Sequence, residues 1–308
     1  MPLTPADFEE GEYRAPLFNQ LSTTNLLWEP GQVFEKYIGI DHAMWSANRY
    51  ILSLHGHSVA PLGVSLPHYD FDYIWSARNK HKKLPPFRLN LFIQAKRPMY
   101  GRHAPKALKA RGIGSPYWRF ELTPHQQVAL ERLHTNLKGR AIVCYACAAF
   151  HTDHLLHKWT VEPEIVEHST FPDVIQLTNH VAWNFSKAGT FGVANAEPTR
   201  MEVGPLLKRL AELARQSEKA EKDISEPTDA ENLTFLADAV AASVENVETS
   251  VSLLQARFRE GVRDIEQAAA AFDLGDGARA FVAFATVRLF TSLYRLNWLV
   301  VGHASHPD

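Results

Sequence analysis

A carboxamide and an ammonium group lie two residues apart at the end of an apolar stretch, at Gln94 and Lys96. Apolar and other residues alternate from 89 to 94 with the two-residue period of a strand, so both polar side chains should leave it on one face. Such groups are costly to bury without a partner. They are candidates for chemistry on an anionic substrate; the alternative is that the strand simply ends there and both are solvated.

Two acids lie upstream, at Glu35 and Asp41, separated by Gly39. The pattern predicts a helix that begins near Pro30, ends before Gly39 and is followed by Asp41 at the start of a strand. An acid in the last turn of a helix is disfavoured by the helix dipole. Glu35 is placed against that preference, which makes it a candidate ligand.

The pattern E-x-x-x-G-x-D followed by a strand that ends in Q-x-K resembles the PD-(D/E)xK nuclease superfamily. In that restriction-endonuclease-like fold, a helix acid, a strand aspartate and a strand (E/D/Q)-x-K surround a magnesium ion. The resemblance covers residues 35 to about 150. It implies an α/β fold, a mixed sheet flanked by helices, and hydrolysis of phosphodiester bonds.

The resemblance also implies the roles of the site residues. Asp41, the side-chain oxygen of Gln94, the backbone carbonyl of Ala95 and Glu35 would bind Mg²⁺ or Mn²⁺, which prefer such hard oxygen ligands. Lys96 would position the attacking water or neutralise the transition state. Glu35, Asp41, Gln94 and Lys96 are thus the expected catalytic set. Gln94 replaces the commoner glutamate and removes a negative charge, although members of the superfamily carry glutamine here.

The elements around Lys96 should build an α/β core. Residues 54–87 read as an insertion, in which Asp70 and Asp72 are an alternative acidic pair, and 97–116 as a loop. Residues 117–122 are strand-like, and Thr123 and Pro124 predict the start of a helix. The apolar run 141–150 predicts a strand buried on both faces. This strand–helix–strand order predicts a parallel pair.

Cations gather around the same motif, although the formal net charge of the chain is only −2. No Asp or Glu occurs from residue 73 to 120, a distribution that favours a polyanionic partner. The nuclease resemblance implies that this partner is nucleic acid, with double-stranded DNA as the expected form. The alternative is a solvated basic loop. The residues expected to bind nucleic acid are Arg78, Lys80, Lys82, Lys83, Arg97 and Arg102.

An alternative metal site is suggested by the spacing of five potential ligands, Cys144, Cys147, His151, His154 and His157. Two cysteines three residues apart in a strand point to opposite faces, so they should not share a tetrahedral zinc ion. Three histidines at helical spacing share one face and could bind a metal or serve a hydrolase, but surface histidines are the simpler interpretation. The sequence therefore favours the acidic and amide ligands over zinc.

A change of character near residue 203 predicts two parts, a nuclease-like α/β domain at 1–203 and a helical domain at 204–308. Helices are expected at about 205–215, 230–267 and 277–301, and residues 1–29 as an irregular arm. The apolar stripe of the long helix predicts an internal bundle, or a homodimer or partner-protein interface. That stripe comprises Leu233, Leu236, Val240, Val244, Val247 and Val251.

Composition and the pattern of apolar residues indicate in which compartment the protein is expected. Two cysteines do not make a disulfide framework, the first residues do not read as a signal peptide, and the apolar stretch 280–301 is interrupted by charge. A cytoplasmic protein without a membrane span is expected. The leading hypothesis is a Mg²⁺-dependent DNA endonuclease, with restriction or antiphage defence as its setting. The alternative is a non-catalytic nucleic-acid-binding or scaffold subunit with a degenerate nuclease fold.

Overall fold

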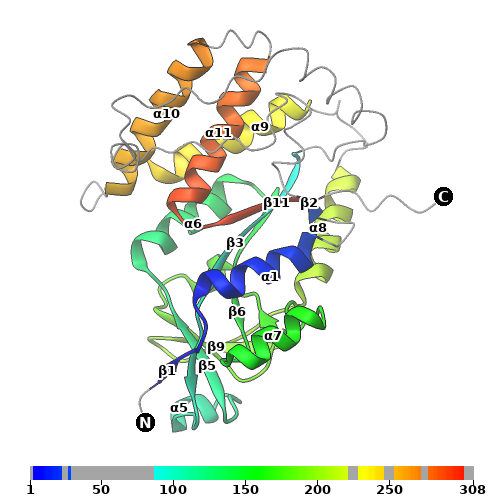
Figure 1. Ribbon diagram of the computed structural model, residues 1–308, viewed down its shortest axis with the longest axis vertical. Helices are drawn as coiled ribbons and strands as arrows, with labels where there is room; N and C mark the ends of the chain where they lie inside the picture. The colour runs from blue at the N-terminus through cyan, green and yellow to red at the C-terminus, as the bar shows by residue number, and fades with distance from the viewer. Residues whose placement is uncertain are drawn as a thin grey trace, which may run out of the picture.

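The computed structural model describes residues 3–22, 27–28, 87–220, 228–245, 253–271 and 277–301. It is a mixed α/β structure in which helices flank the sheets (Figure 1). The helices are α1 (Glu10–Ser22), α5 (Lys106–Lys109), α6 (Pro124–Asn136), α7 (Asp153–Val161), the 3-10 helix η1 (Val174–Leu177), α8 (Leu206–Ala220), α9 (Asp229–Val244), α10 (Leu253–Ala271) and α11 (Gly277–Leu293). The strands are β1 (Thr4–Pro5), β2 (Leu27–Trp28), β3 (Leu89–Lys96), β4 (Met99–Gly101), β5 (Tyr117–Glu121), β6 (Ala141–Ala148), β7 (Ser169–Thr170), β8 (Ala182–Phe185), β9 (Phe191–Asn195), β10 (Thr199–Glu202) and β11 (Asn297–Val301).

The sheet that holds β3 has the strand order β2-β11-β3-β6-β7. Strands β3 and β6 run parallel, while β11 is antiparallel to both β2 and β3. Every residue of β3 is buried, as the apolar run predicts for an internal strand with both faces covered. The two polar residues at its exit are therefore enclosed by the elements that cover the sheet.

The other described sheet is antiparallel, with the order β1-β4-β5-β8-β9-β10. Strand β4 begins three residues after Lys96, so the chain leaves one sheet and enters the other directly after the predicted site. The prediction that β5 and β6 form a parallel pair was wrong. Strand β5 pairs antiparallel with β4 and β8, and β6 pairs with β3 instead, although α6 leads into β6 as predicted.

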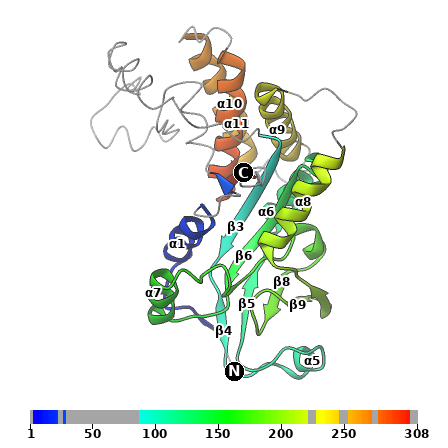
Figure 2. The ribbon, with the colours of Figure 1, turned by 90° about the vertical axis from the view of Figure 1, so that its right-hand side faces the viewer.

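Alternation along β3 divides its side chains between two cores, one on each face of the sheet. Phe92 packs in the core formed with α6, α9 and α11, whereas Leu91 and Ile93 pack in the core formed with α1 and α8. Figure 2 shows α1 and α6 on opposite sides of β3. The helices thus fix β3 from both faces.

The expected irregular arm at residues 1–29 was wrong, because residues 10–22 form α1. Its buried residues Tyr13, Leu17 and Leu21 repeat every four positions, and Phe18 extends this face. Pro16 lies inside the helix and obscured the pattern in the sequence. The first turn of α1 carries two acids, Glu10 and Glu12.

The expected final helix is too long, because α11 ends at Leu293 and residues 297–301 form β11. Arg295, with a φ of 55°, turns the chain between them. The expected helix at 230–267 corresponds to α9 and α10, and residues 246–252 between them lie outside the described part. By contrast, Thr123 as N-cap position and Pro124 in the first turn of α6 are confirmed.

The C-terminal part is helical, as expected, but its elements pack on the sheet. Leu233, Leu236, Val240 and Val244 of the predicted apolar stripe are buried in the core that also contains Phe92. These four residues therefore have partners within the chain, and a homodimer or partner-protein interface through the stripe remains a prediction. Val247 and Val251 lie outside the described residues. No helix in the described ranges is long and apolar enough to cross a membrane.

Candidate active site

Gln94 and Lys96 lie at the exit of β3 on the face that carries Phe92, which confirms that they share one face. The exposed fractions are only 2% for Gln94 and 8% for Lys96. An amide and an ammonium at such depth must be compensated by partners, because desolvation of either group is unfavourable. Their surroundings therefore decide whether the pair is structural or chemical.

One acceptor serves both side chains. Oε1 of Gln126, in the first turn of α6, accepts a hydrogen bond from Nε2 of Gln94 at 3.1 Å and a long one from Nζ of Lys96 at 3.5 Å. Nε2 of Gln94 also donates to the backbone carbonyl of Tyr294 at 3.0 Å. Both amide hydrogens of Gln94 are thus engaged.

The remaining polar atom of Gln94 is not engaged. Its Oε1 is buried and has no hydrogen-bond partner among the described residues. A buried acceptor without a partner is unfavourable, and in native structures it calls for an explanation such as a bound water or ion. The amide orientation that satisfies both donors leaves this oxygen available, and an amide oxygen is a suitable ligand for a hard cation.

A hydrogen-bonded network fixes the first turn of α6. The hydroxyl of Tyr145 on β6 donates to Oε1 of Gln127 at 2.5 Å, and Nε2 of Gln127 donates to Glu131 at 2.7 Å and to the carbonyl of Val174 at 2.8 Å. Burial raises the pKa of Tyr145, and the charge of Glu131 raises it further, so this phenol stays a neutral donor. Nζ of Lys96 lies 5.5 Å from the centre of the Tyr145 ring.

An acid that the sequence did not single out lies near this pair. Glu10, half-buried in the first turn of α1, has its pKa raised by burial, an effect opposed by the charges of Lys96, Arg295 and Arg14. Conversely, burial lowers the pKa of Lys96, and the charge of Glu10 raises it. The first-turn position of the acid could have drawn attention to Glu10, had Pro16 not obscured the helix.

Contacts at the end of β3 hold the first turn of α1 in place. Arg97 donates from Nη1 to Glu9 at 2.7 Å and from Nη2 to the carbonyl of Ala6 at 2.5 Å, and the amide of Ala6 donates to the carbonyl of Pro98 at 2.9 Å. Arg97, which was expected to bind nucleic acid, is thus engaged within the protein. Its contacts join the end of β3 to the segment that leads into α1.

The structure brings together only part of the expected set. Glu35 and Asp41 lie outside the described residues, so the clustering of all four catalytic candidates remains a prediction. Ala95 is buried in the core on the opposite face, and the expected role concerns its backbone carbonyl. The alternative acids Asp70 and Asp72 also lie outside the described part, as do the expected nucleic-acid-binding residues Arg78, Lys80, Lys82 and Lys83.

The rival zinc site does not form in the described part of the chain, which contains no group of three or more His, Cys, Asp or Glu suited to a metal ion. Cys144 and Cys147 are free and lie in different cores, as the strand geometry predicts. Burial raises the pKa of Cys144 to about 12. His154 and His157 are exposed, while His151 stacks on Tyr100 with a ring separation of 3.7 Å.

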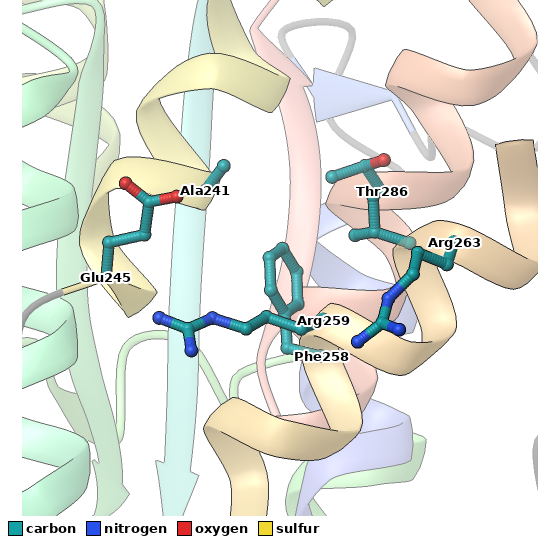
Figure 3. Close-up of a pocket in the computed structure, with 7 residues that line it drawn as sticks. Ala241, Glu245, Phe258, Arg259, Arg263 and Thr286 are labelled. Atoms are coloured by element: carbon teal, nitrogen blue, oxygen red, sulfur yellow. The ribbon is translucent and has the colours of Figure 1, made fainter. Parts of the chain in front are cut away.

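A separate pocket of about 320 Å³ lies among α9, α10 and α11 (Figure 3). Phe258 lines it, with Arg259 and Arg263 from the same helix and Glu245 across the opening. It shares no residue with the Gln94–Lys96 pair, and Glu245 is the only acid among its lining residues. The pocket and the Gln94–Lys96 pair are therefore separate features of the structure.

Comparison with known proteins does not identify the chain. No family model, no curated protein and no solved structure matches it. The likeness to the PD-(D/E)xK superfamily therefore rests on the sequence motifs.

Proposed function

We propose that the chain is a metal-dependent nuclease that hydrolyses phosphodiester bonds of double-stranded DNA. The observation that carries the proposal is the buried, unpartnered Oε1 of Gln94 beside the buried ammonium of Lys96 on one face of β3. At a phosphate site, an oxygen without a hydrogen-bond partner can bind a metal ion, and a fixed positive charge can neutralise the phosphate. Restriction or antiphage defence is the biological setting that we propose.

The donor atoms suit Mg²⁺ or Mn²⁺. Gln94 would provide its free Oε1, and we propose that Asp41, Glu35 and the carbonyl of Ala95 complete the ligands. Glu10 is a further acid at the same strand end, supported by its electrostatic interaction with Lys96. When bound, the ion would polarise the phosphate and lower the pKa of a coordinated water.

The residues of the chain would position and neutralise the reacting groups. Lys96 would place its charge against a phosphate oxygen or orient the attacking water, and its burial strengthens this interaction because little water screens it. Gln126 sets the orientation of both side chains through its shared Oε1. The Tyr145–Gln127–Glu131 network fixes the turn that carries Gln126.

The test is a nuclease assay on plasmid and linear DNA with Mg²⁺ or Mn²⁺, beside chelated samples. Lys96→Met should lose roughly 100-fold or more in cleavage rate, the usual effect of removing a group that stabilises developing charge. Lys208→Met, at an exposed position of α8, is the matched control and should retain the activity. Equal cleavage by all three proteins would identify a contaminating nuclease and refute the proposal.

The second candidate is a non-catalytic DNA-binding or scaffold subunit. It is favoured by the uncharged Gln94, because the described end of β3 then carries no acid of its own. DNA binding without cleavage under any divalent metal, with Lys96→Met binding as well as the natural chain, would support this alternative.

A further inference from the structure

The connection between β4 and β5 forms a small cationic projection, here called the α5 lobe and defined as residues 101–116. Figures 1 and 2 show it at the end of the molecule opposite α10 and α11. It has a core of its own, where Ala104, Leu108 and Ile113 pack with Tyr117 and Val193. The lobe is thus a folded projection that packs on residues of β5 and β9 in the antiparallel sheet.

Hydrogen bonds and close packing fix the lobe to its base. The amide of Ala104 donates to Oγ of Ser115 at 2.9 Å, and the amide of Gly114 donates to Oγ of Ser186 at 3.0 Å. The ring of Tyr117 packs so closely on Gly101 that a Cβ there would lie 2.1 Å from it. Side chains on the lobe surface therefore have a defined position relative to β4.

The cations of the lobe differ from their neighbours in being unpaired. On the adjoining elements Arg97 pairs with Glu9, Arg119 with Glu121, and Arg200 with Glu202. The lobe contains no acid, and its four cations are exposed without an ion pair to any described residue. These cations are Arg102, Lys106, Lys109 and Arg111.

The position of the lobe relates it to the candidate active site. Arg102 follows Lys96 by six residues, so at a strand rise of about 3.3 Å per residue the two backbones lie within about 20 Å. This reach corresponds to about six base pairs of a duplex. On the proposed nuclease function, the flank of a duplex whose cleaved phosphate lies at Lys96 would be within this reach of the lobe.

We propose that the α5 lobe binds the phosphate backbone of double-stranded DNA, on one side of the cleaved phosphate and within about six base pairs of it. Fixed, unpaired cations suit a polyanion with regularly spaced charges. The distance to the cleaved phosphate rests on the proposed nuclease function, whereas the binding of DNA does not.

The experiment measures binding of a labelled duplex of about 30 base pairs in chelator, as a function of salt. The lobe variant carries Arg102→Glu, Lys106→Glu and Lys109→Glu. The control carries Lys208→Glu, Arg215→Glu and Arg257→Glu at exposed helix positions, so both have the same formal charge, −2 minus 6, or −8. The lobe variant should lose at least about tenfold in affinity, and its salt slope should fall by about 2.7, or 0.9 per lost contact. The control should bind within about threefold of the natural chain.

Three results would overturn the proposal. Equal weakening of both variants would show that net charge alone governs binding, and unchanged binding by the lobe variant would exclude the lobe. Lobe-dependent binding to phosphatidylserine vesicles but not to the duplex would assign a different partner. Glutamine at the three lobe positions provides a second variant with less electrostatic repulsion, and circular dichroism verifies that each variant is folded.

Cleavage assays separate this proposal from the nuclease assignment. Lobe-dependent binding without cleavage by any metal-loaded sample would refute the nuclease while the lobe site stands. Cleavage that survives the lobe substitutions together with unchanged affinity would refute the lobe site alone. If both proposals hold, cleavage should require a flank of about six base pairs on one side of the cut.

Discussion

Gln94 and Tyr294 are 200 residues apart in the chain and are joined by a hydrogen bond of 3.0 Å, from the side-chain amide of Gln94 to the backbone carbonyl of Tyr294. Tyr294 directly follows α11, and β11 then enters the sheet beside β3. The C-terminal part therefore determines the orientation of the amide whose oxygen we propose as a metal ligand.

Gln94→Glu should make the stability of the folded protein depend strongly on bound metal. The carboxylate cannot donate to Tyr294 or Gln126, so the metal-free variant should lose about 2–4 kcal/mol of stability through an unpaired buried group. Mg²⁺ or Mn²⁺ should restore much of this loss by binding the folded state. Thermal unfolding with and without metal measures both effects. Gln94→Met is the control without an oxygen ligand, and an equal response of both variants to metal would contradict the assignment.

Lys96→Met should stabilise the fold by about 1 kcal/mol while it lowers the cleavage rate, as at other sites where function costs stability. Because burial lowers the pKa of Lys96, the folded state binds its proton less tightly than the unfolded state. The loss of folding stability caused by the buried ammonium is complete below the pKa of Lys96 in the folded state. It vanishes as the pH rises past the ordinary lysine pKa of 10.5. Urea unfolding at neutral and alkaline pH should show the advantage of the variant shrink, and a less stable variant at neutral pH would contradict this account.

Glu10→Gln should shift the alkaline limb of the activity profile to lower pH. The charge of Glu10 raises the pKa of Lys96, so its removal leaves burial less opposed and Lys96 loses its proton earlier. A protonated Lys96 is needed for charge neutralisation, and activity should fall accordingly. A pH–rate profile measures the limb, with Glu162→Gln, at the exposed C-cap position of α7, as the control. A lower rate with an unmoved limb would assign Glu10 a role that does not act through Lys96.

Tyr145→Phe should destabilise the protein by about 1–2 kcal/mol, because Oε1 of Gln127 loses its donor in a buried position. A double-mutant cycle with Gln127→Met should recover part of this energy, since the second change removes the unsatisfied acceptor. Chemical unfolding of the four proteins gives the coupling. Strict additivity would show that the two side chains do not stabilise α6 together.

Local features predicted the elements nearest the site. The two-residue period placed Gln94 and Lys96 on one face of β3, and Thr123 with Pro124 marked the start of α6. The residues that complete their surroundings, among them Gln126, Glu10 and Tyr294, come from other elements. Their approach depends on tertiary packing, which short-range patterns do not encode. The same reason explains why β11 was taken for helix, since its apolar run becomes a strand only by pairing with β2 and β3.

The place of β11 between β2 and β3 also bears on the order in which the protein matures. Strand β11 is the last described element along the chain, yet it occupies an interior position of the sheet and abuts the strand that carries Gln94. During translation, the edge of β3 that pairs with β11 lacks this partner until β11 has emerged from the ribosome. The carbonyl of Tyr294, which orients Gln94, is synthesised just before β11. The nascent protein can therefore complete the proposed active site only after this segment has been translated.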